Sequence, residues 1–179
     1  MRWILTPKPS EEKIKQLSQS LGVGPIIASL LLQRGIETYE AAKAFFRPSL
    51  DELHDPFLMK DMDLAVLRIE AAIAAEENIL VFGDYDVDGT SSVALLSSYL
   101  LSYYPNIATY IPDRYAEGYG VSYQGIDYAE DNGFSLIIAL DCGVKAIDKV
   151  VYASEKNIDF IICDHHRPGS ELPKAKAVL

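Results

Sequence analysis

The sequence predicts an α/β protein in which a parallel β-sheet is flanked by helices and preceded by a small helical region. Residues 1–75 show helical patterns alone, whereas short apolar runs alternate with helical patterns in residues 76–179. Such alternation produces βαβ units and therefore a parallel sheet. Apolar residues make up 49% of the chain, which is enough for a packed core. We expect a helical N-terminal region over 1–75 and the first part of a sheet domain over 76–179.

Four helices are expected in the first part of the chain. Ser10 is placed to cap the helix in SEEKIKQLSQSL, and two acids follow it in the first turn. Thr38 is placed to cap the third helix, in TYEAAKAFF. The apolar face of the second helix, in GPIIASLLLQRG, consists of Ile26, Ile27, Leu30 and Leu31. The side chains of the fourth helix, in DMDLAVLRIEAAIAAEE, that we expect to face a core are Leu64, Leu67, Ile69 and Ile73.

Strands and helices alternate through the second part. The expected strands are NILVFGD, IATYIPD, FSLIIALD and IDFIICD, whose continuous apolar runs are typical of strands buried on both faces. The helices between them are expected in GTSSVALLSSYLLSYY, SYQGIDYAEDNG and VKAIDKVVYASEKN, and the final AKAVL resembles the start of another strand. Right-handed crossovers would then bring every carboxyl end to one edge of a Rossmann-like sheet.

Composition excludes several classes of protein. The net charge of −10 argues against a simple nucleic-acid clamp, which should be basic. No apolar run reaches the roughly 18–20 residues that a membrane span needs, and the first residues are too weakly apolar for a signal peptide. The two cysteines, Cys142 and Cys163, provide no disulfide framework. We therefore expect a cytoplasmic protein that does not contact a membrane.

Three of the expected strands end in an aspartate: Asp84, Asp141 and Asp164. Ligands of open α/β sheets bind at the carboxyl ends of the strands, so these side chains should converge. The full set of acids and imidazoles expected at this edge is Asp84, Asp86, Asp88, Asp141, Asp164, His165 and His166. So many carboxylates repel one another unless cations bind among them. Oxygen ligands with one imidazole suit Mn²⁺ or Mg²⁺ better than Zn²⁺, so we expect a hydrolytic site with two such cations.

The stretch DYDVDG, residues 84–89, also begins like the calcium loop of an EF-hand. Position 12 of that loop would be Leu95, where a bidentate glutamate is required. An apolar strand also precedes the loop, where an EF-hand has a helix. Glycine-rich nucleotide loops, G-x-G-x-x-G or G-K-[ST], do not occur in the sequence. These observations favour the catalytic interpretation of the three carboxylates.

The stretches VFGDYDVDGTSS (81–92), LDCG (140–143) and DHH (164–166) resemble the three motifs of the DHH phosphoesterase superfamily. Two further segments, YIPDRYAEGYG (110–120) and the lead-in over 34–69, are similar to members that degrade single-stranded DNA. The resemblance covers nearly the whole chain. It implies a metal-dependent 5′-to-3′ exonuclease that hydrolyses single-stranded DNA to mononucleotides in DNA repair and recombination, with single-stranded DNA and other repair proteins as partners.

The resemblance also implies roles for individual residues. The metal ligands would be Asp84, Asp86, Asp141 and His165. His166 would face the scissile phosphate, and two further catalytic groups, Asp88 and Asp164, would orient the ligands. The residues that would contact the substrate are Arg114, Gly118, Tyr119 and Gly120.

One part of the family pattern is missing. Members carry a further metal-binding aspartate well downstream of DHH, whereas only 13 residues follow His166 and Glu171 is the sole acid among them. We therefore expect an N-terminal piece of a longer protein that lacks the rest of the DHH domain and the substrate-binding domain, and that has little activity alone. Two alternatives stay open: a phosphoesterase for short oligonucleotides, cyclic dinucleotides or pyrophosphate, and a non-catalytic binding module of the same fold.

Overall fold

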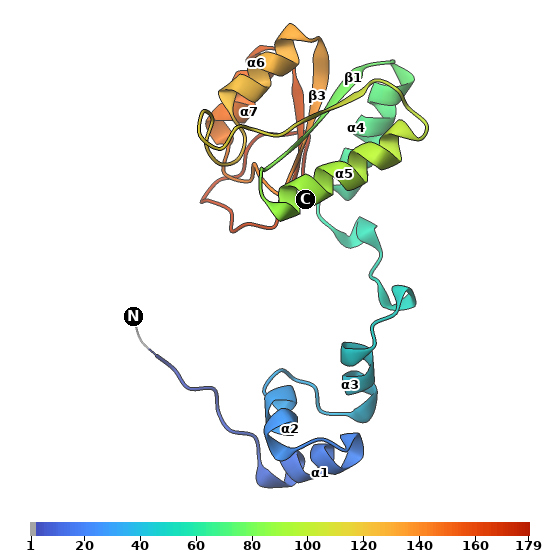
Figure 1. Ribbon diagram of the computed structural model, residues 1–179, viewed down its shortest axis with the longest axis vertical. Coiled ribbons are helices and arrows are strands. Elements are labelled where there is room, and N and C mark those ends of the chain that lie inside the picture. Colours follow the sequence, from blue (N-terminus) through green and yellow to red (C-terminus); the bar gives the residue numbers. More distant parts are fainter. Residues whose placement is uncertain (1–2) are drawn as a thin grey trace. The chain divides into compact units, whose positions relative to one another are not determined.

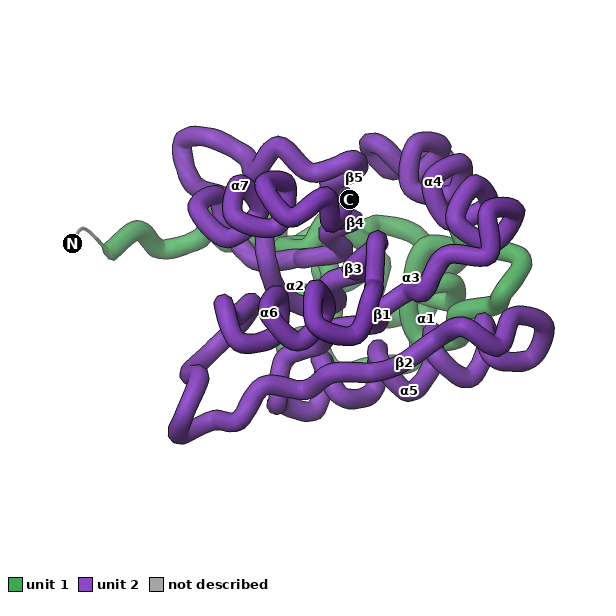
Figure 2. Tube along the Cα trace, turned by 90° about the horizontal axis from the view of Figure 1, so that it is seen from above, with its two compact units in different colours: residues 1–55 green, residues 56–179 purple. Residues whose placement is uncertain are grey.

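The chain divides into two compact units, residues 1–55 and residues 56–179, which Figure 2 colours separately. The computed structural model describes residues 3–179. The division precedes the boundary that the sequence suggested after residue 75, because the helix over residues 62–74 packs on the sheet. Within the described residues, no helix is long and apolar enough to cross a membrane. Whether a further domain belongs to the protein stays a prediction.

The first unit is helical, as predicted, and its helix starts are those expected from the capping residues. Ser10 accepts a hydrogen bond from the backbone N–H of Lys13, and Thr38 accepts one from Ala41. The elements are α1 (Glu11–Leu21), α2 (Pro25–Leu32), α3 (Tyr39–Phe46) and the 3₁₀ helix η1 (Leu50–Glu52). The core of the unit consists of Ile14, Leu17, Ala28, Leu31 and Leu32.

The apolar face expected for α2 is largely outside this core. Leu31 is buried, but Ile26 is 75% exposed, and Ile27 and Leu30 are also exposed. The buried face instead contains Ala28, because the small side chain lets α2 approach α1 closely. Because α2 is apolar on all sides, the spacing of its apolar residues does not indicate which face is buried.

The second unit is a five-stranded parallel sheet with helices on both faces (Figure 1). The strand order is β2-β1-β3-β4-β5, and every neighbouring pair is parallel. The strands are β1 (Asn78–Gly83), β2 (Ile107–Tyr110), β3 (Phe134–Leu140), β4 (Asp159–Cys163) and β5 (Ala177–Val178). The helices are η2 (Pro56–Leu58), α4 (Met62–Ala74), α5 (Val87–Leu101), α6 (Tyr123–Asp131) and α7 (Ile147–Glu155). The predicted fold class is confirmed.

Each face of the sheet has its own layer of helices. Alternate residues of a strand point to opposite faces, so Leu80 and Phe82 pack toward α6 and α7, while Ile79 and Val81 pack toward α4 and α5. Figure 1 shows the same two layers. Burial on both faces explains why the strands are apolar without interruption.

The inner face of α4 differs from the prediction. Leu64 and Leu67 were expected to face the core, but they are 47% and 60% exposed. The buried residues are Ala65 and Ala72, with Ile69 and Ile73 partly buried beside them. Alanines bring the helix axis close to the sheet, so the leucines on either side are left at the surface.

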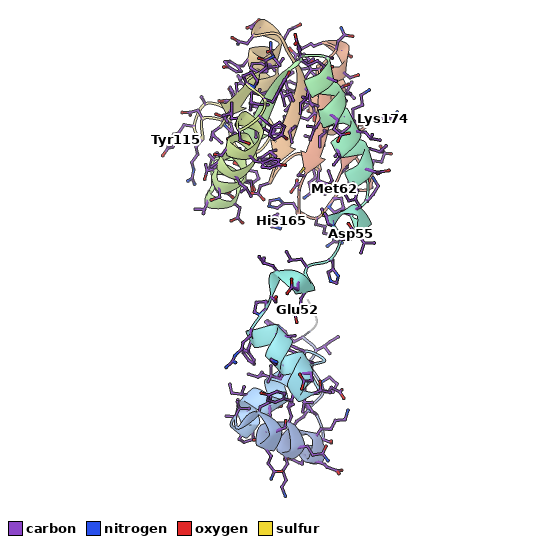
Figure 3. The ribbon with its side chains drawn as sticks, turned by 90° about the vertical axis from the view of Figure 1, so that its right-hand side faces the viewer. Glu52, Asp55, Met62, Tyr115, His165 and Lys174 are labelled. Carbon is purple, nitrogen blue, oxygen red and sulfur yellow. The ribbon has the colours of Figure 1, made fainter. Side chains whose placement is uncertain are left out.

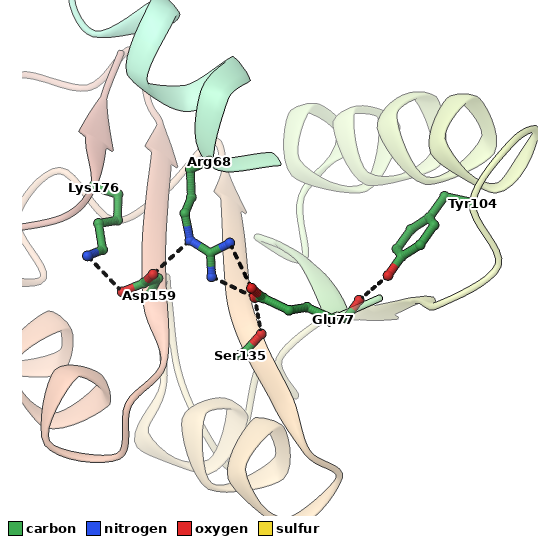
Figure 4. A network of polar contacts seen from close by, with 6 residues as sticks. All are labelled: Arg68, Glu77, Tyr104, Ser135, Asp159 and Lys176. Carbon is green, nitrogen blue, oxygen red and sulfur yellow. Dashed lines mark hydrogen bonds and ion pairs between the residues drawn. The ribbon is translucent and has the colours of Figure 1, made fainter. Parts of the chain in front are cut away.

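A polar network fastens α4 to the amino ends of the strands (Figure 4). The Arg68 guanidinium donates hydrogen bonds of 2.7 Å to the carboxylates of Glu77 and Asp159. Ser135 donates a further hydrogen bond to Glu77, and the Tyr104 hydroxyl donates one to the Glu77 carbonyl. The network joins the starts of β1, β3 and β4, opposite the carboxyl ends, and so holds the sheet that positions the site.

Gly125 provides one test of the packing between α6 and the sheet. A Cβ atom there would lie 2.6 Å from the Phe82 ring and 3.1 Å from the Tyr110 ring. We expect Gly125→Ala to lower the free energy of unfolding by about 1–2 kcal/mol, because two large rings must move. Urea denaturation measures the effect, and Gly169→Ala, where a Cβ meets only ordinary contacts, should be neutral. Equal stability of the two variants would contradict this packing.

Glu77 provides a test of the network by pH. Hydrogen bonds from Arg68 hold the pKa of Glu77 below its usual 4.5, against the opposing effect of burial. A carboxyl group whose pKa is lower in the folded chain stabilises it above the unfolded pKa, and this contribution is lost as pH falls. We therefore expect the stability difference between wild type and Glu77→Gln to be largest at neutral pH and to shrink below about pH 4.5. Exposed Glu155→Gln is the control, and a difference that does not change with pH would contradict the prediction.

Candidate active site

The candidate site lies at the carboxyl edge of the sheet, where the strand order reverses. The chain passes from β1 to β2 on one side and then crosses back to β3 on the other, and ligands of open α/β sheets bind at such a switch point. Asp84 directly follows β1, Asp141 follows β3 and Asp164 follows β4. Figure 3 shows His165 at this edge, beyond the ends of the strands.

Asp84 is fully buried and held by backbone amides. Its Oδ1 accepts a hydrogen bond of 2.6 Å from the N–H of Tyr85, and its Oδ2 accepts one of 3.1 Å from the N–H of Gly120. Burial raises the pKa of Asp84, and the nearby Asp86 carboxylate raises it further. A Cβ at Gly89 would lie 2.4 Å from the Asp84 carbonyl oxygen, so only glycine lets α5 begin this close to the strand end.

Asp86 lies beyond the end of the strand, in the cap of the helix that follows. β1 ends at Gly83, so Asp86 lies beyond the strand and caps α5, accepting a 2.9 Å hydrogen bond from the N–H of Gly89. The charge of the Asp86 carboxylate nevertheless acts on both Asp84 and Asp141, so this side chain belongs to the same cluster. Asp88 is in the first turn of α5 and borders the same cavity as Asp141.

Asp141 has an unusual backbone conformation for a residue with a side chain. Its φ is 60°, in the left-handed region that costs energy for any residue except glycine. Its carboxylate is buried, and its Oδ1 lies 3.0 Å from Nε2 of His165. Burial and the Asp86 charge raise the pKa of Asp141, while the two histidines, His165 and His166, oppose them. Asp141 therefore combines a strained backbone with a buried carboxylate that is repelled by the Asp86 charge.

Asp164 orients His166. Its Oδ1 accepts a hydrogen bond of 3.0 Å from the His166 N–H and lies 2.8 Å from the ring Nδ1, while its Oδ2 accepts one of 2.9 Å from the N–H of Val144. Burial acts to raise the pKa of Asp164, but these hydrogen bonds prevail and lower it. The contact with Asp164 in turn raises the pKa of His166. The imidazole therefore keeps Nδ1 on Asp164 and directs Nε2 toward the Tyr119 hydroxyl, 3.3 Å away.

The side chains at this edge fit a divalent cation. Ligand atoms of Asp141, His165 and His166 lie within 4.8 Å of one another, and the charge of the Asp86 carboxylate acts on Asp141. Asp84 and Asp141 are buried, and burial together with the Asp86 charge raises the pKa of each. Carboxylate oxygens with imidazole nitrogen match the preferences of Mn²⁺ and Mg²⁺.

The loop after β2 brings the four expected substrate residues to this edge. Gly118 and Gly120 have φ values of 86° and 81°, which turn the loop so that the Gly120 amide meets Asp84. The Arg114 guanidinium lies 5.3 Å from the centre of the Tyr85 ring, and the Tyr119 ring meets Tyr85 edge-on at 5.8 Å. Burial and the surrounding carboxylates raise the pKa of Tyr119 to about 12, so its hydroxyl stays protonated. Tyr85 was not identified from the sequence, where its place between two acids was the only signal.

Two cavities flank the carboxylate cluster. One, of about 570 Å³, we call the methionine cavity; its walls include Met59, Met62, Asp88, Ser92, Asp141 and His165. The other, of about 300 Å³, we call the lysine cavity; its walls include Tyr119, Gly143, Lys145, Lys149, Asp164 and His166. The only sign of the second cavity in the sequence is a lysine two residues after the LDCG motif, which is too weak a signal to predict a site.

Comparison with known proteins gives a consistent result. Residues 78–179 match the DHH family, N-terminal domain. The chain is 41% identical over all 179 residues to the single-stranded-DNA-specific exonuclease RecJ of Bacillus subtilis (strain 168), of which it covers 23%. It spans about a quarter of the length of the curated relatives it matches.

Solved structures show the same similarity. RecJ from Thermus thermophilus in complex with Mn²⁺ matches 96% of this chain and 24% of that chain, with a TM-score of 0.70 and 25% identity. An exonuclease RecJ bound to manganese matches 65% of this chain and 30% of that chain, with a TM-score of 0.59 and 31% identity.

The geometry predicts where a cation should bind. We expect Asp141→Asn to weaken Mn²⁺ binding by the chain at least about tenfold, because the buried Asp141 carboxylate lies 3.0 Å from His165 and its ligand atom is grouped with those of His165 and His166. Titration calorimetry or the electron paramagnetic resonance of free Mn²⁺ measures the change. Asp131→Asn, an exposed acid at the end of α6, removes the same charge away from the site and should bind like wild type. Equal affinity of the two variants would place the cation elsewhere.

Proposed function

The chain belongs to the DHH family, and from this premise we propose that it is the metal-binding part of an exonuclease that hydrolyses single-stranded DNA. The observation that carries the proposal is that Asp84, Asp141 and the Asp164–His166 segment follow three neighbouring strands at one edge of the sheet, where Asp141, His165 and His166 are close enough to share a cation. The similarity to single-stranded-DNA-specific exonucleases supports the choice of substrate.

We propose that Asp84, Asp86, Asp141 and His165 hold two divalent cations, Mn²⁺ or Mg²⁺. When bound, such ions activate water and stabilise negative charge on phosphoryl oxygens. The chain's contribution is to fix the ligands before the ions arrive. Two amides hold Asp84, and the end of β3 holds Asp141 in a left-handed conformation. Fixed ligands of this kind bind an ion without first losing side-chain freedom.

His166 is proposed to act on the phosphoryl group directly. Asp164 holds one ring nitrogen and raises the pKa of the imidazole, which favours the protonated form that donates from Nε2. A phosphoryl oxygen within reach of Nε2 would receive that hydrogen bond and lose part of its developing charge. The Tyr119 hydroxyl, now 3.3 Å from Nε2, would give up this contact when the substrate enters. We further propose that Asp88, on α5, orients ligands from the methionine cavity.

The loop after β2 is proposed to hold the strand. Arg114 stacks on Tyr85, which leaves its guanidinium N–H groups free for a phosphate, since guanidinium groups combine stacking with hydrogen bonding. The half-exposed ring of Tyr119 offers a face on which a base can stack. Gly118 and Gly120 shape this loop. We propose that cleavage runs 5′ to 3′ and releases mononucleotides, and that the protein works in the cytoplasm in DNA repair and recombination with other repair proteins.

Activity tests the proposal in the natural protein that carries this chain. We expect Mn²⁺-dependent release of mononucleotides from single-stranded DNA, and a loss of about 100-fold or more in Asp141→Asn, because a direct ligand should matter more than its supporting residues. Asp131→Asn serves as the matched control. Full activity of Asp141→Asn, or activity in excess chelator, would contradict the proposal.

Substrate length tests the choice of DNA. Turnover on a long single strand should exceed turnover on a dinucleotide at equal concentration, because a long strand can contact the loop after β2 as well as the cation site. Faster turnover of the dinucleotide would instead indicate a phosphoesterase for short oligonucleotides. Tight Mn²⁺ binding without any hydrolysis would indicate a binding module.

A further inference from the structure

The two cavities beside the carboxylate cluster differ in charge. The walls of the methionine cavity include Asp88, Asp141 and His165 and contain no lysine or arginine. The walls of the lysine cavity contain both Lys145 and Lys149. The cluster is therefore acidic on one side and has two ammonium groups on the other. A polyanionic DNA strand that crosses the site would be repelled on the acidic side and attracted on the side of the two ammonium groups.

Lys145 is available to a ligand. It lies in the connection between β3 and α7, with its side chain exposed to solvent. Among the ion pairs of residues 3–179, none involves Lys145. Both Lys145 and His166 are among the walls of the lysine cavity, so the ammonium group shares this cavity with the histidine. A cation without a partner, next to the reacting groups, is suited to an anionic part of the substrate.

Lys149 is positioned in advance by its neighbours. Its Nζ lies 5.1 Å from the centre of the Tyr123 ring and 3.5 Å from Asp148. Asp148 also accepts a 2.7 Å hydrogen bond from the Tyr123 hydroxyl, and it is mostly exposed, so its hold on Lys149 is weak. The aromatic ring thus orients the lysine, and the carboxylate beside it is a mostly exposed one that a phosphate can replace.

No free anion within the lysine cavity competes for these two charges. Its one carboxylate, Asp164, already accepts hydrogen bonds from His166 and Val144. The volume of about 300 Å³ is at the lower end of the range for small-ligand sites, which suits a single phosphate with its sugar. The volume of the lysine cavity and the charge of its walls therefore both favour a phosphate group with its sugar.

We propose that the lysine cavity binds a phosphate group of the DNA strand, at a linkage next to the one being cleaved, through Lys145 and Lys149. The inference rests on the proposed function and adds to it the direction in which the DNA strand leaves the site. The strand leaves the cation site on the side of α7, away from the methionine cavity. Because both contacts are to phosphate, they add affinity without adding base specificity.

Salt dependence tests this inference in the natural protein that carries the chain. We expect Lys145→Gln with Lys149→Gln to raise KM for oligo-dT, to leave kcat unchanged, and to reduce the slope of log affinity against log salt by about 0.7, the value for one phosphate that is no longer neutralised. Fluorescence anisotropy of a labelled oligo-dT and cleavage are measured side by side. The loss should be equal for oligo-dC, and Lys145→Arg should restore most of it.

Controls separate the two proposals. Lys174→Gln removes an exposed lysine from the segment between β4 and β5, outside both cavities, and should behave like wild type (Figure 3). Equal salt slopes of wild type and the double variant would contradict the proposed phosphate site in the lysine cavity but not the proposed exonuclease. A wild-type protein that binds oligo-dT without cleaving it would contradict the proposed exonuclease alone. Absence of binding by the wild type would contradict both.

Neutral linkages locate the phosphate. A methylphosphonate has no negative charge, so placing one at successive linkages of oligo-dT removes one phosphate contact at a time. We expect one position, next to the scissile linkage, at which wild type and the double variant bind equally well. A difference that persists unchanged at every position would show that the lysines act through general charge and would contradict a defined subsite.

Discussion

Repulsion between carboxylates at the ends of three parallel strands is the constraint on which the rest of this structure depends. Asp84 and Asp141 are buried, each is close to Asp86, and the pKa of each buried acid is raised. A fold gains nothing from such a cluster by itself, because buried like charges cost free energy. A divalent cation bound among these carboxylates would offset their repulsion, which explains why the fold places them together as ligands.

The surrounding structure holds these acids together against that repulsion. Backbone amides of Tyr85 and Gly120 fix Asp84, glycine at position 89 lets α5 start against the strand end, and Asp164 is paired with His166. At the far edge of the sheet, the Arg68 network ties the strand starts to α4. Five of the acids behind the net charge of −10 are in the site, so the remainder of the chain carries −10 + 5 = −5. The site and the remainder of the chain therefore contribute equally to the net negative charge.

Local signals in the sequence were enough to predict the strands, the helix caps and the convergence of the strand-end acids, because each follows from periodicity and parallel topology. Features that depend on how elements approach one another could not be predicted in this way. Alanines rather than leucines face inward on α4, and Asp86 lies in a helix cap rather than in a strand. The pairing of Lys145 with Lys149 in one cavity depends on the start of α7, which no short motif specifies.

The central claim is that the strand-end acids form a cation site. Anomalous diffraction from crystals of the chain grown with Mn²⁺ tests it most directly. The account predicts a manganese peak within about 2–2.5 Å of carboxylate oxygens of Asp141 and of either Asp84 or Asp86, with His165 Nε2 as a nitrogen ligand. Manganese bound elsewhere, with these side chains unmoved and uncoordinated, would contradict the account.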